Sequence, residues 1–164
     1  VIAMVTDRIK ADLYTAAMLM DNNDMPFLKD LAAYHTQQAL EKCLKYYLNN
    51  IYGISKKSEE YFTHNIASLF ISVDSYDKSF TAKHRELAVL SNKITAWESM
   101  GRYSDMQVID NDISLLTVSR VLELTKDIYE EILEYEKLNQ SKAKAKAKHI
   151  KKNLKYREDR NYEG

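Results

Sequence analysis

Glycine and proline are scarce in this chain, which has three glycines and one proline among its 164 residues. Hairpins and tight turns depend on these residue types, so the sequence lacks most of the turns that a β-sheet would need. Leu, Ala, Lys, Glu and Ile are frequent instead and recur with helical spacing. The length suits one domain with its own core. The sequence therefore predicts an all-α domain.

Cysteine and long apolar runs are also nearly absent. The single cysteine, Cys43, has no second cysteine with which to form an intramolecular disulfide. The sequence contains no secretory signal and no apolar run of about 18 residues, the length that a membrane-spanning helix needs. These absences predict a soluble, cytoplasmic protein without a membrane partner, in which Cys43 is a small buried residue.

Metal and phosphate-loop motifs are missing as well. Di-iron bundles use Glu-x-x-His pairs, and zinc sites on helices use paired histidines or several cysteines. Neither Glu-x-x-His nor His-x-x-x-His occurs in the chain, and it has no glycine-rich phosphate loop. We therefore expect no metal and no cofactor.

Five segments with apolar residues at helical spacing follow one another, separated by short polar breaks. The expected helices are residues 7–20, about 24–52, 59–73, about 81–100, and from 110 or 112 onward. Thr6 is predicted to cap the first helix and Asp110 or Asp112 the fifth. Gly53 and Gly101 are predicted to end the second and the fourth. This pattern predicts an up-and-down bundle of four to five antiparallel helices.

Charge is distributed unevenly, although 24 basic and 24 acidic residues balance over the whole chain. Residues 141–164 contain nine basic and three acidic residues, which leaves 15 basic and 21 acidic residues in 1–140. A basic segment of this kind can bind a polyanion, its own acidic body or another copy. We therefore divide the chain into a helical bundle, residues 1–140, and a basic tail, residues 141–164, that is helical or frayed.

The segment HTQQALEKCLKYYLNN, residues 35–50, carries a line of polar residues on an otherwise apolar helix. Gln38, Glu41, Lys42 and Lys45 stand at positions i, i+3, i+4 and i+7 and so share one face. One interpretation is a solvated edge with a Glu41–Lys45 ion pair. The other is a binding strip, in which the lysines contact phosphate and Gln38 orients a base or a partner side chain.

Several short motifs, taken in order, resemble the HEPN domain, the higher eukaryotes and prokaryotes nucleotide-binding fold. QQALEKCLK is similar to the family pattern Gln-Ala-x-Glu-Lys-x-x-Lys on the second helix. THNIASL is similar to a His-hydrophobic-x-x-Leu element, and GRYSD approximates an Arg-Tyr-Pro element. Together with RIKADLYTAAML in the first helix, the resemblance covers roughly residues 7–138.

The resemblance implies a helical bundle that dimerises, binds nucleotide or RNA and, in bacteria, often pairs with a nucleotidyltransferase in toxin–antitoxin operons. Family ribonucleases use an Arg, four to six spacer residues and a His. None of the histidines here, His35, His64, His84 and His149, follows an arginine at that distance. Cleavage through the 2′-hydroxyl needs a group that exchanges protons near neutral pH, and imidazole suits this best. We therefore expect no ribonuclease activity by the usual family mechanism.

The candidate residues for nucleotide or RNA binding are Gln38, Glu41, Lys42, Lys45, His64, Arg102 and Tyr103. Arg102 offers a fork for phosphate and Tyr103 a stacking face, although both residues also suit a structural anchor at a helix end. His64 suits a helix cap as well as a proton-transfer or phosphate contact. His35 is expected in the core and His84 in solvent.

Three hypotheses follow from these observations. The first is a non-catalytic HEPN-type bundle that binds nucleotide or RNA, as a homodimer beside a nucleotidyltransferase. The second is a structural interaction module that binds no nucleic acid. The third is a ribonuclease with a non-standard set, such as His64 with Arg102 and Lys45.

Overall fold

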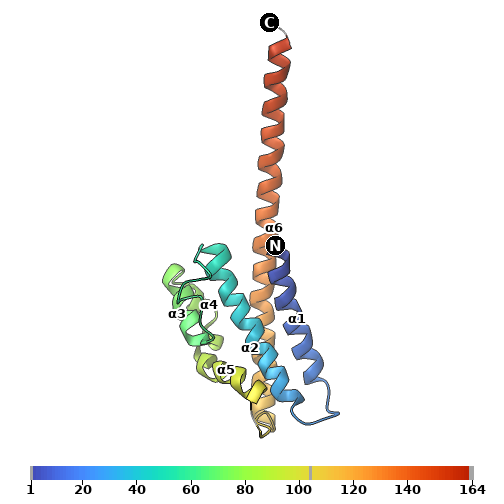
Figure 1. Cartoon of the computed structure of the whole chain (residues 1–164), viewed down its shortest axis with the longest axis vertical. Helices are drawn as coiled ribbons and strands as arrows, with labels where there is room; N and C mark the ends of the chain where they lie inside the picture. The colour runs from blue at the N-terminus through green and yellow to red at the C-terminus, as the bar shows by residue number, and fades with distance from the viewer. Residues whose placement is uncertain (1, 104, 163–164) are drawn as a thin grey trace. The chain divides into compact units, whose positions relative to one another are not determined.

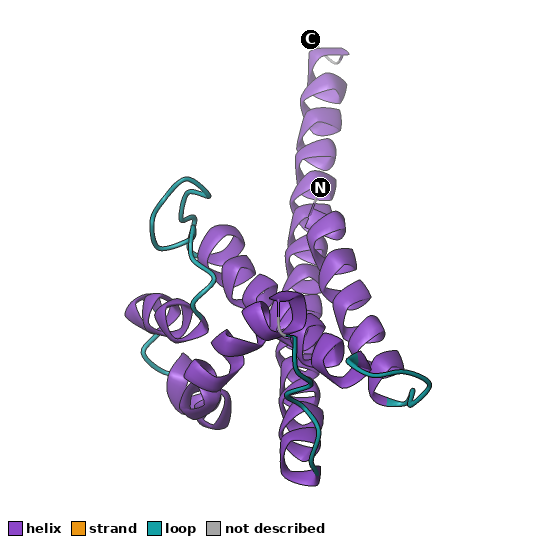
Figure 2. Cartoon of the chain, turned by 60° about the horizontal axis from the view of Figure 1, so that its bottom comes forward, coloured by secondary structure: helices purple, strands orange, loops and turns teal. Residues whose placement is uncertain are grey.

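The computed structural model describes residues 2–103 and 105–162, and this part of the chain contains helices and no strand (Figure 1). The predicted all-α fold is confirmed. The helices are α1 (Ile2–Met20), α2 (Leu28–Tyr46), the π-helix η1 (Tyr47–Ile51), α3 (Ile66–Tyr76), α4 (Phe80–Lys83), α5 (Arg85–Tyr103) and α6 (Asp112–Tyr162). Figure 2 shows the loops that join them.

The chain forms two compact units, one ending at Tyr129 and one beginning at Glu130. In the first unit, α2 is central, because it packs against α1, α3 and α5. The core consists of apolar side chains from these helices, among them Ile9, Leu13, Leu40, Leu44, Leu69, Val73, Ile94 and Trp97. Cys43 is fully buried among them, as predicted, and burial raises the pKa of its thiol.

The second unit is the C-terminal part of α6. Ile132 is buried there, whereas residues 137–160 are all exposed. The described residues of the basic tail are helical up to Tyr162. Intrinsic helix propensity therefore has to stabilise the exposed part of this unit.

At the start of two helices the cap differs from the prediction, because an asparagine side chain caps each of them. Helix α3 begins at Ile66 rather than near residue 59, because the Asn65 side chain accepts a hydrogen bond from the Ser68 amide at 3.0 Å. Asn111, not Asp110 or Asp112, accepts from the Ser114 amide at 2.9 Å at the start of α6. Thr6 is no cap, since α1 already begins at Ile2.

The two predicted glycine stops have different outcomes. Gly53 follows η1 with φ of +72°, a left-handed conformation that favours glycine, so the predicted end of the second helix is confirmed. Gly101 lies inside α5, and its prediction as a stop is wrong. A Cβ atom at Gly101 would stand 2.3 Å from the Cβ of Tyr34 on α2. Gly101 is therefore required by the close contact between α5 and α2.

Candidate functional site

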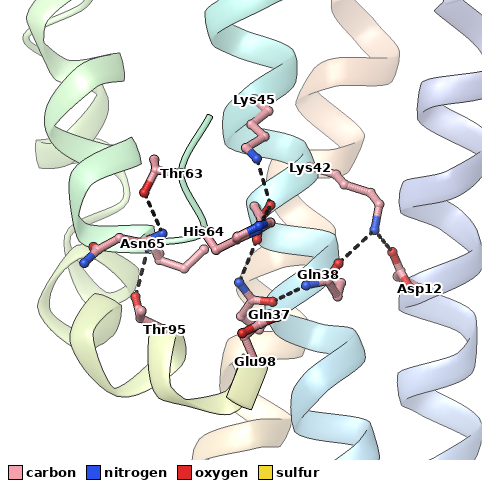
Figure 3. A network of polar contacts seen from close by, with 12 residues as sticks. Asp12, Gln37, Gln38, Lys42, Lys45, Thr63, His64, Asn65, Thr95 and Glu98 are labelled. Carbon is pink, nitrogen blue, oxygen red and sulfur yellow. Dashed lines mark hydrogen bonds and ion pairs between the residues drawn. The ribbon is translucent and has the colours of Figure 1, made fainter. Parts of the chain in front are cut away.

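Glu41 is the centre of a polar network on α2 and is not part of a solvated edge. Its side chain is only 7% exposed. Its carboxylate accepts hydrogen bonds from Gln37 Nε2, Lys45 Nζ and His64 Nδ1, each at 2.9 Å. The predicted Glu41–Lys45 pair is confirmed, but the interpretation as a solvent-facing edge is wrong, because Glu41 is buried and the loop before α3 brings His64 against it (Figure 3).

The network continues along α2 toward α1 (Figure 3). Gln38 Nε2 donates to Gln37 Oε1 at 2.7 Å, and Lys42 Nζ lies 3.5 Å from Gln38 Oε1. Lys42 also forms an ion pair of 2.6 Å with Asp12 of α1. The other oxygen of Asp12 contacts Nδ1 of His35, again on α2, at 2.9 Å. The polar line of the sequence thus connects α1 with the start of α3.

The two carboxylates of this network stay ionised despite their burial. Burial alone would raise the pKa of Glu41, but hydrogen bonds from Lys45, Gln37 and His64 outweigh it, so the pKa lies below its ordinary value of 4.5. Burial would likewise raise the pKa of Asp12, and hydrogen bonds from His35 and Lys42 lower it below 3.8. Two fixed negative charges therefore hold the surrounding donors in place.

The loop before α3 positions His64. The amide of Ile66 donates to Thr95 Oγ1 of α5 at 2.9 Å, and Thr63 Oγ1 accepts from the Asn65 amide at 3.1 Å (Figure 3). These bonds fix the backbone on the C-terminal side of His64, while Glu41 holds its ring. The side chain remains 70% exposed. His64 is therefore an oriented imidazole at the surface, and Asn65 rather than His64 is the helix cap.

Lys45, which shares the Glu41 carboxylate with His64, also lines a small basic hollow. It is lined by Val5, Lys42, Lys45, Tyr46, Asn50, Lys56 and Tyr61, and its volume is about 50 Å³. The ammonium of Lys45 stands 5.2 Å from the centre of the Tyr61 ring. Partial burial and the nearby Glu41 carboxylate raise the pKa of Tyr61, so its hydroxyl stays protonated near neutral pH. A volume this small admits a phosphate oxygen or a few waters rather than a whole nucleotide.

A family model for the HEPN domain matches residues 8–138. The chain belongs to the HEPN family. Neither the curated proteins nor the solved structures contain a match to it. The matched range runs from residue 8 of α1 to residue 138 of α6, so it includes the Glu41 network and excludes the basic tail.

Arg102 and Tyr103 of this HEPN domain have no described contact with Glu41, Lys45 or His64, although Glu98, which pairs with Arg102, belongs to the polar network in Figure 3. They end α5, where Arg102 forms an ion pair of 2.6 Å with Glu98, one turn earlier, and its guanidinium stands 4.9 Å from the Tyr103 ring centre. Hydrogen bonding to Glu98 raises the pKa of Arg102. Both residues are exposed. Among the described contacts, none joins Arg102 to His64 or Lys45.

Carboxylates within the domain already pair with the three cations predicted to bind phosphate. Lys42 pairs with Asp12, Lys45 with Glu41 and Arg102 with Glu98. Of the seven predicted site residues, Glu41, Lys45 and His64 meet at one point, Gln38 and Lys42 extend the network toward α1, and Arg102 and Tyr103 stand at the end of α5. A phosphate at Lys45 would have to compete with the Glu41 carboxylate or share the ammonium with it.

Sequence analysis missed Asp12, Gln37 and Tyr61. Asp12 had a detectable signal, because it stands three residues after Ile9 and four before Ala16, on the apolar face of the first helix. A carboxylate on that face requires a buried partner. Tyr61 had no signal, since the loop fold that brings its ring to Lys45 depends on contacts between distant helices.

Neither a metal cluster nor a membrane span is found in the part of the chain that the structure describes. No three His, Cys, Asp or Glu side chains there are grouped so that they could share a metal ion. None of its helices is both long and apolar enough to cross a bilayer.

Proposed function

We propose that this HEPN domain binds a nucleotide or unpaired RNA at the surface around Lys45, Lys56, Tyr61 and His64, without the Arg and His ribonuclease mechanism of the family. The observation that carries the proposal is the convergence of Lys45 Nζ and His64 Nδ1 on the same oxygen of buried Glu41. A buried, ionised carboxylate that fixes a lysine and an exposed imidazole reduces the entropy lost when these groups bind a ligand.

The chemistry of this surface suits a phosphate next to a base. Lys56 is exposed beside Lys45 in the basic hollow and supplies a positive charge that is open to solvent. The aromatic ring of Tyr61 offers a face on which an unpaired base can stack. His64 donates or accepts a hydrogen bond through the ring edge that does not contact Glu41. Arg102 and Tyr103, at the end of α5, offer a further cation and ring that an RNA strand can contact.

Two single charge reversals test this binding surface, one at a lysine that lines the hollow and one at a neighbouring lysine that does not. Lys56→Glu should weaken binding of a mononucleotide and of a short single-stranded RNA about tenfold, because a phosphate contact becomes a repulsion. Lys57→Glu is the matched control, since Lys57 is an exposed neighbour that does not line the hollow. Calorimetric titration measures both affinities.

Equal loss in both variants would show that only overall charge matters, and the proposed surface would be wrong. Absence of binding in the unaltered protein at millimolar nucleotide would favour the alternative interaction module, which binds no nucleic acid.

The Glu41–His64 contact favours ribonuclease activity as a second candidate. A carboxylate that bonds one ring nitrogen of a histidine orients the ring for proton transfer at the other nitrogen. Lys45 would then stabilise negative charge on the phosphate. Our proposal predicts no specific cleavage of RNA by purified protein in EDTA. Specific cleavage that His64→Ala abolishes would replace the first proposal by this one.

A nucleotidyltransferase partner in a toxin–antitoxin system is supported by family membership alone. The proposal predicts that the gene beside the one for this protein encodes a nucleotidyltransferase and that the two proteins purify together when they are expressed together. A neighbouring nucleotidyltransferase that does not bind this chain would contradict it.

A further inference from the structure

One exposed line on α6 carries carboxylates at one end and lysines at the other. Within the second unit it consists of Glu130, Glu134, Lys137, Ser141, Lys144 and Lys148, all of which are exposed. Successive members are 4, 3, 4, 3 and 4 residues apart. Alternating steps of four and three keep residues on one face of a helix. Charge is therefore separated along a single helical face.

The spacing of this line is the same when it is read from either end. Two copies of the helix that run in opposite directions can therefore align their lines position by position. Glu130 then faces Lys148 of the second copy, Glu134 faces Lys144, and Lys137 faces Ser141. Both halves of the pair form the same contacts, which is the self-complementarity that a two-fold interface requires.

The alternative alignment of two such helices is unfavourable. In a parallel pair each residue faces itself, so that carboxylates oppose carboxylates and lysines oppose lysines. Antiparallel pairing replaces the repulsions at Glu130, Glu134, Lys144 and Lys148 by attractions and places Lys137 opposite the uncharged Ser141. The sequence also continues the pattern by the same steps, with Asp127 and Glu123 before the line and Lys151 and Lys155 after it.

We propose that this face of α6 is an interface between two copies of the chain, which pair antiparallel through the Glu130–Lys148 line. Charge complementarity along the line identifies a second copy as the occupant. The remaining basic residues of the tail, such as Lys142 and Lys146, lie off the line and are open to solvent. A polyanion would use all the lysines alike, whereas this interface uses only those on the line.

Charge reversal on and off the line tests the interface. Light scattering at tens of micromolar protein and low salt should give twice the chain mass of 19.1 kDa. Lys144→Glu with Lys148→Glu makes four facing pairs repulsive and should raise the dissociation constant of the dimer at least about tenfold. Lys142→Glu with Lys146→Glu changes the net charge equally and should leave the constant unchanged.

A compensating variant separates the interface from a loss of helix. Glu130→Lys with Glu134→Lys should also dissociate the dimer when it is tested alone. A mixture of this variant with Lys144→Glu, Lys148→Glu should form a heterodimer, because positions 130 and 148, and positions 134 and 144, are then all of opposite charge across the pair. Restoration of association by mixing two defective chains excludes misfolding as the cause of either defect.

Cysteine cross-linking determines the direction of the two helices. A chain with Glu130→Cys and a chain with Lys148→Cys should form a disulfide-linked heterodimer on mild oxidation, since these positions face each other in the antiparallel pair. The buried native thiol, Cys43, does not take part. A monomer at low salt, equal loss of dimer in the on-line and off-line variants, or preferential linkage of Lys148→Cys to itself would each overturn the proposal.

Discussion

At the residue scale, Glu41 determines the geometry of the candidate site. A buried carboxylate without partners would be costly, but here three donors from α2 and from the loop before α3 satisfy it. The same bonds keep Lys45 and His64 at fixed positions. The stability of the fold and the arrangement of the site therefore depend on one side chain. Substitution of Glu41 should change both the free energy of unfolding and its dependence on pH.

Glu41→Gln should lower the free energy of unfolding at pH 7 by about 1 to 3 kcal/mol, because three donors lose an ionised acceptor while the shape of the side chain is kept. Chemical denaturation followed by circular dichroism measures this change. Glu59→Gln, at an exposed glutamate on the loop that precedes α3, is the control and should change stability little.

Glu41 should also produce part of the acid sensitivity of the fold. Its pKa is lowered in the folded state, so its contribution to stability is present above the ordinary pKa of 4.5 and is lost as the pH falls through the lowered value. The unaltered protein should therefore lose stability below about pH 4.5 more steeply than Glu41→Gln does. Parallel pH profiles of the two proteins would contradict this assignment.

At the scale of elements, the contact between α5 and α2 sets where the end of α5 can lie. Gly101 allows α5 to approach Tyr34 so closely that a β-carbon would not fit. The same turn of α5 carries Glu98 and Arg102. The position of the Arg102 surface relative to α2 therefore depends on a glycine that looks like a helix stop in the sequence.

Gly101→Ala should destabilise the protein by about 1 to 3 kcal/mol, because the new methyl group forces α5 away from α2. Helix propensity alone predicts the opposite sign, a gain of up to about 1 kcal/mol for alanine over glycine. The sign of the change in the free energy of unfolding therefore shows whether residue 101 is tightly packed against α2 or open to solvent.

Gly53→Ala provides the comparison for Gly101→Ala. No atom lies within 4 Å of a β-carbon at Gly53, but its positive φ should cost about 1 to 2 kcal/mol through backbone strain alone. Only Gly101→Ala should in addition change the environment of Trp97, one turn earlier on α5, in fluorescence spectra.

At the scale of the whole molecule, the acidic bundle and the basic tail should contribute differently to RNA binding. Deletion of residues 141–164 removes nine basic residues and no buried side chain among those described. At a protein concentration at which two copies do not associate through α6, the bundle should therefore unfold at nearly the same denaturant concentration. Binding of long RNA should weaken and depend less steeply on salt, by a slope of about 0.7 for each lost phosphate contact.

Mononucleotide affinity should be nearly unchanged by this deletion, because a mononucleotide offers too few phosphates to reach both the tail and the candidate site. Lys56→Glu should show the reverse pattern, with a loss of about tenfold for small ligands. Loss of all binding on tail deletion, with no effect of Lys56→Glu, would instead assign the interaction to the tail.

The sequence by itself determined the all-α class, the approximate helix positions, the family and the charge separation along the chain. These properties depend on composition, periodicity and local order, which a linear sequence contains. It also placed Gln38, Glu41, Lys42 and Lys45 on one helical face, because helical geometry fixes which residues of a helix are neighbours.

Only the tertiary structure decided what surrounds that face. Packing of the bundle buried Glu41, α1 supplied Asp12 to Lys42, and the loop before α3 brought His64 to Glu41 and Tyr61 to Lys45. The meaning of Gly101 likewise depended on Tyr34, 67 positions away in the chain. Contacts between residues so distant in sequence follow from how whole helices pack, and no local pattern encodes them.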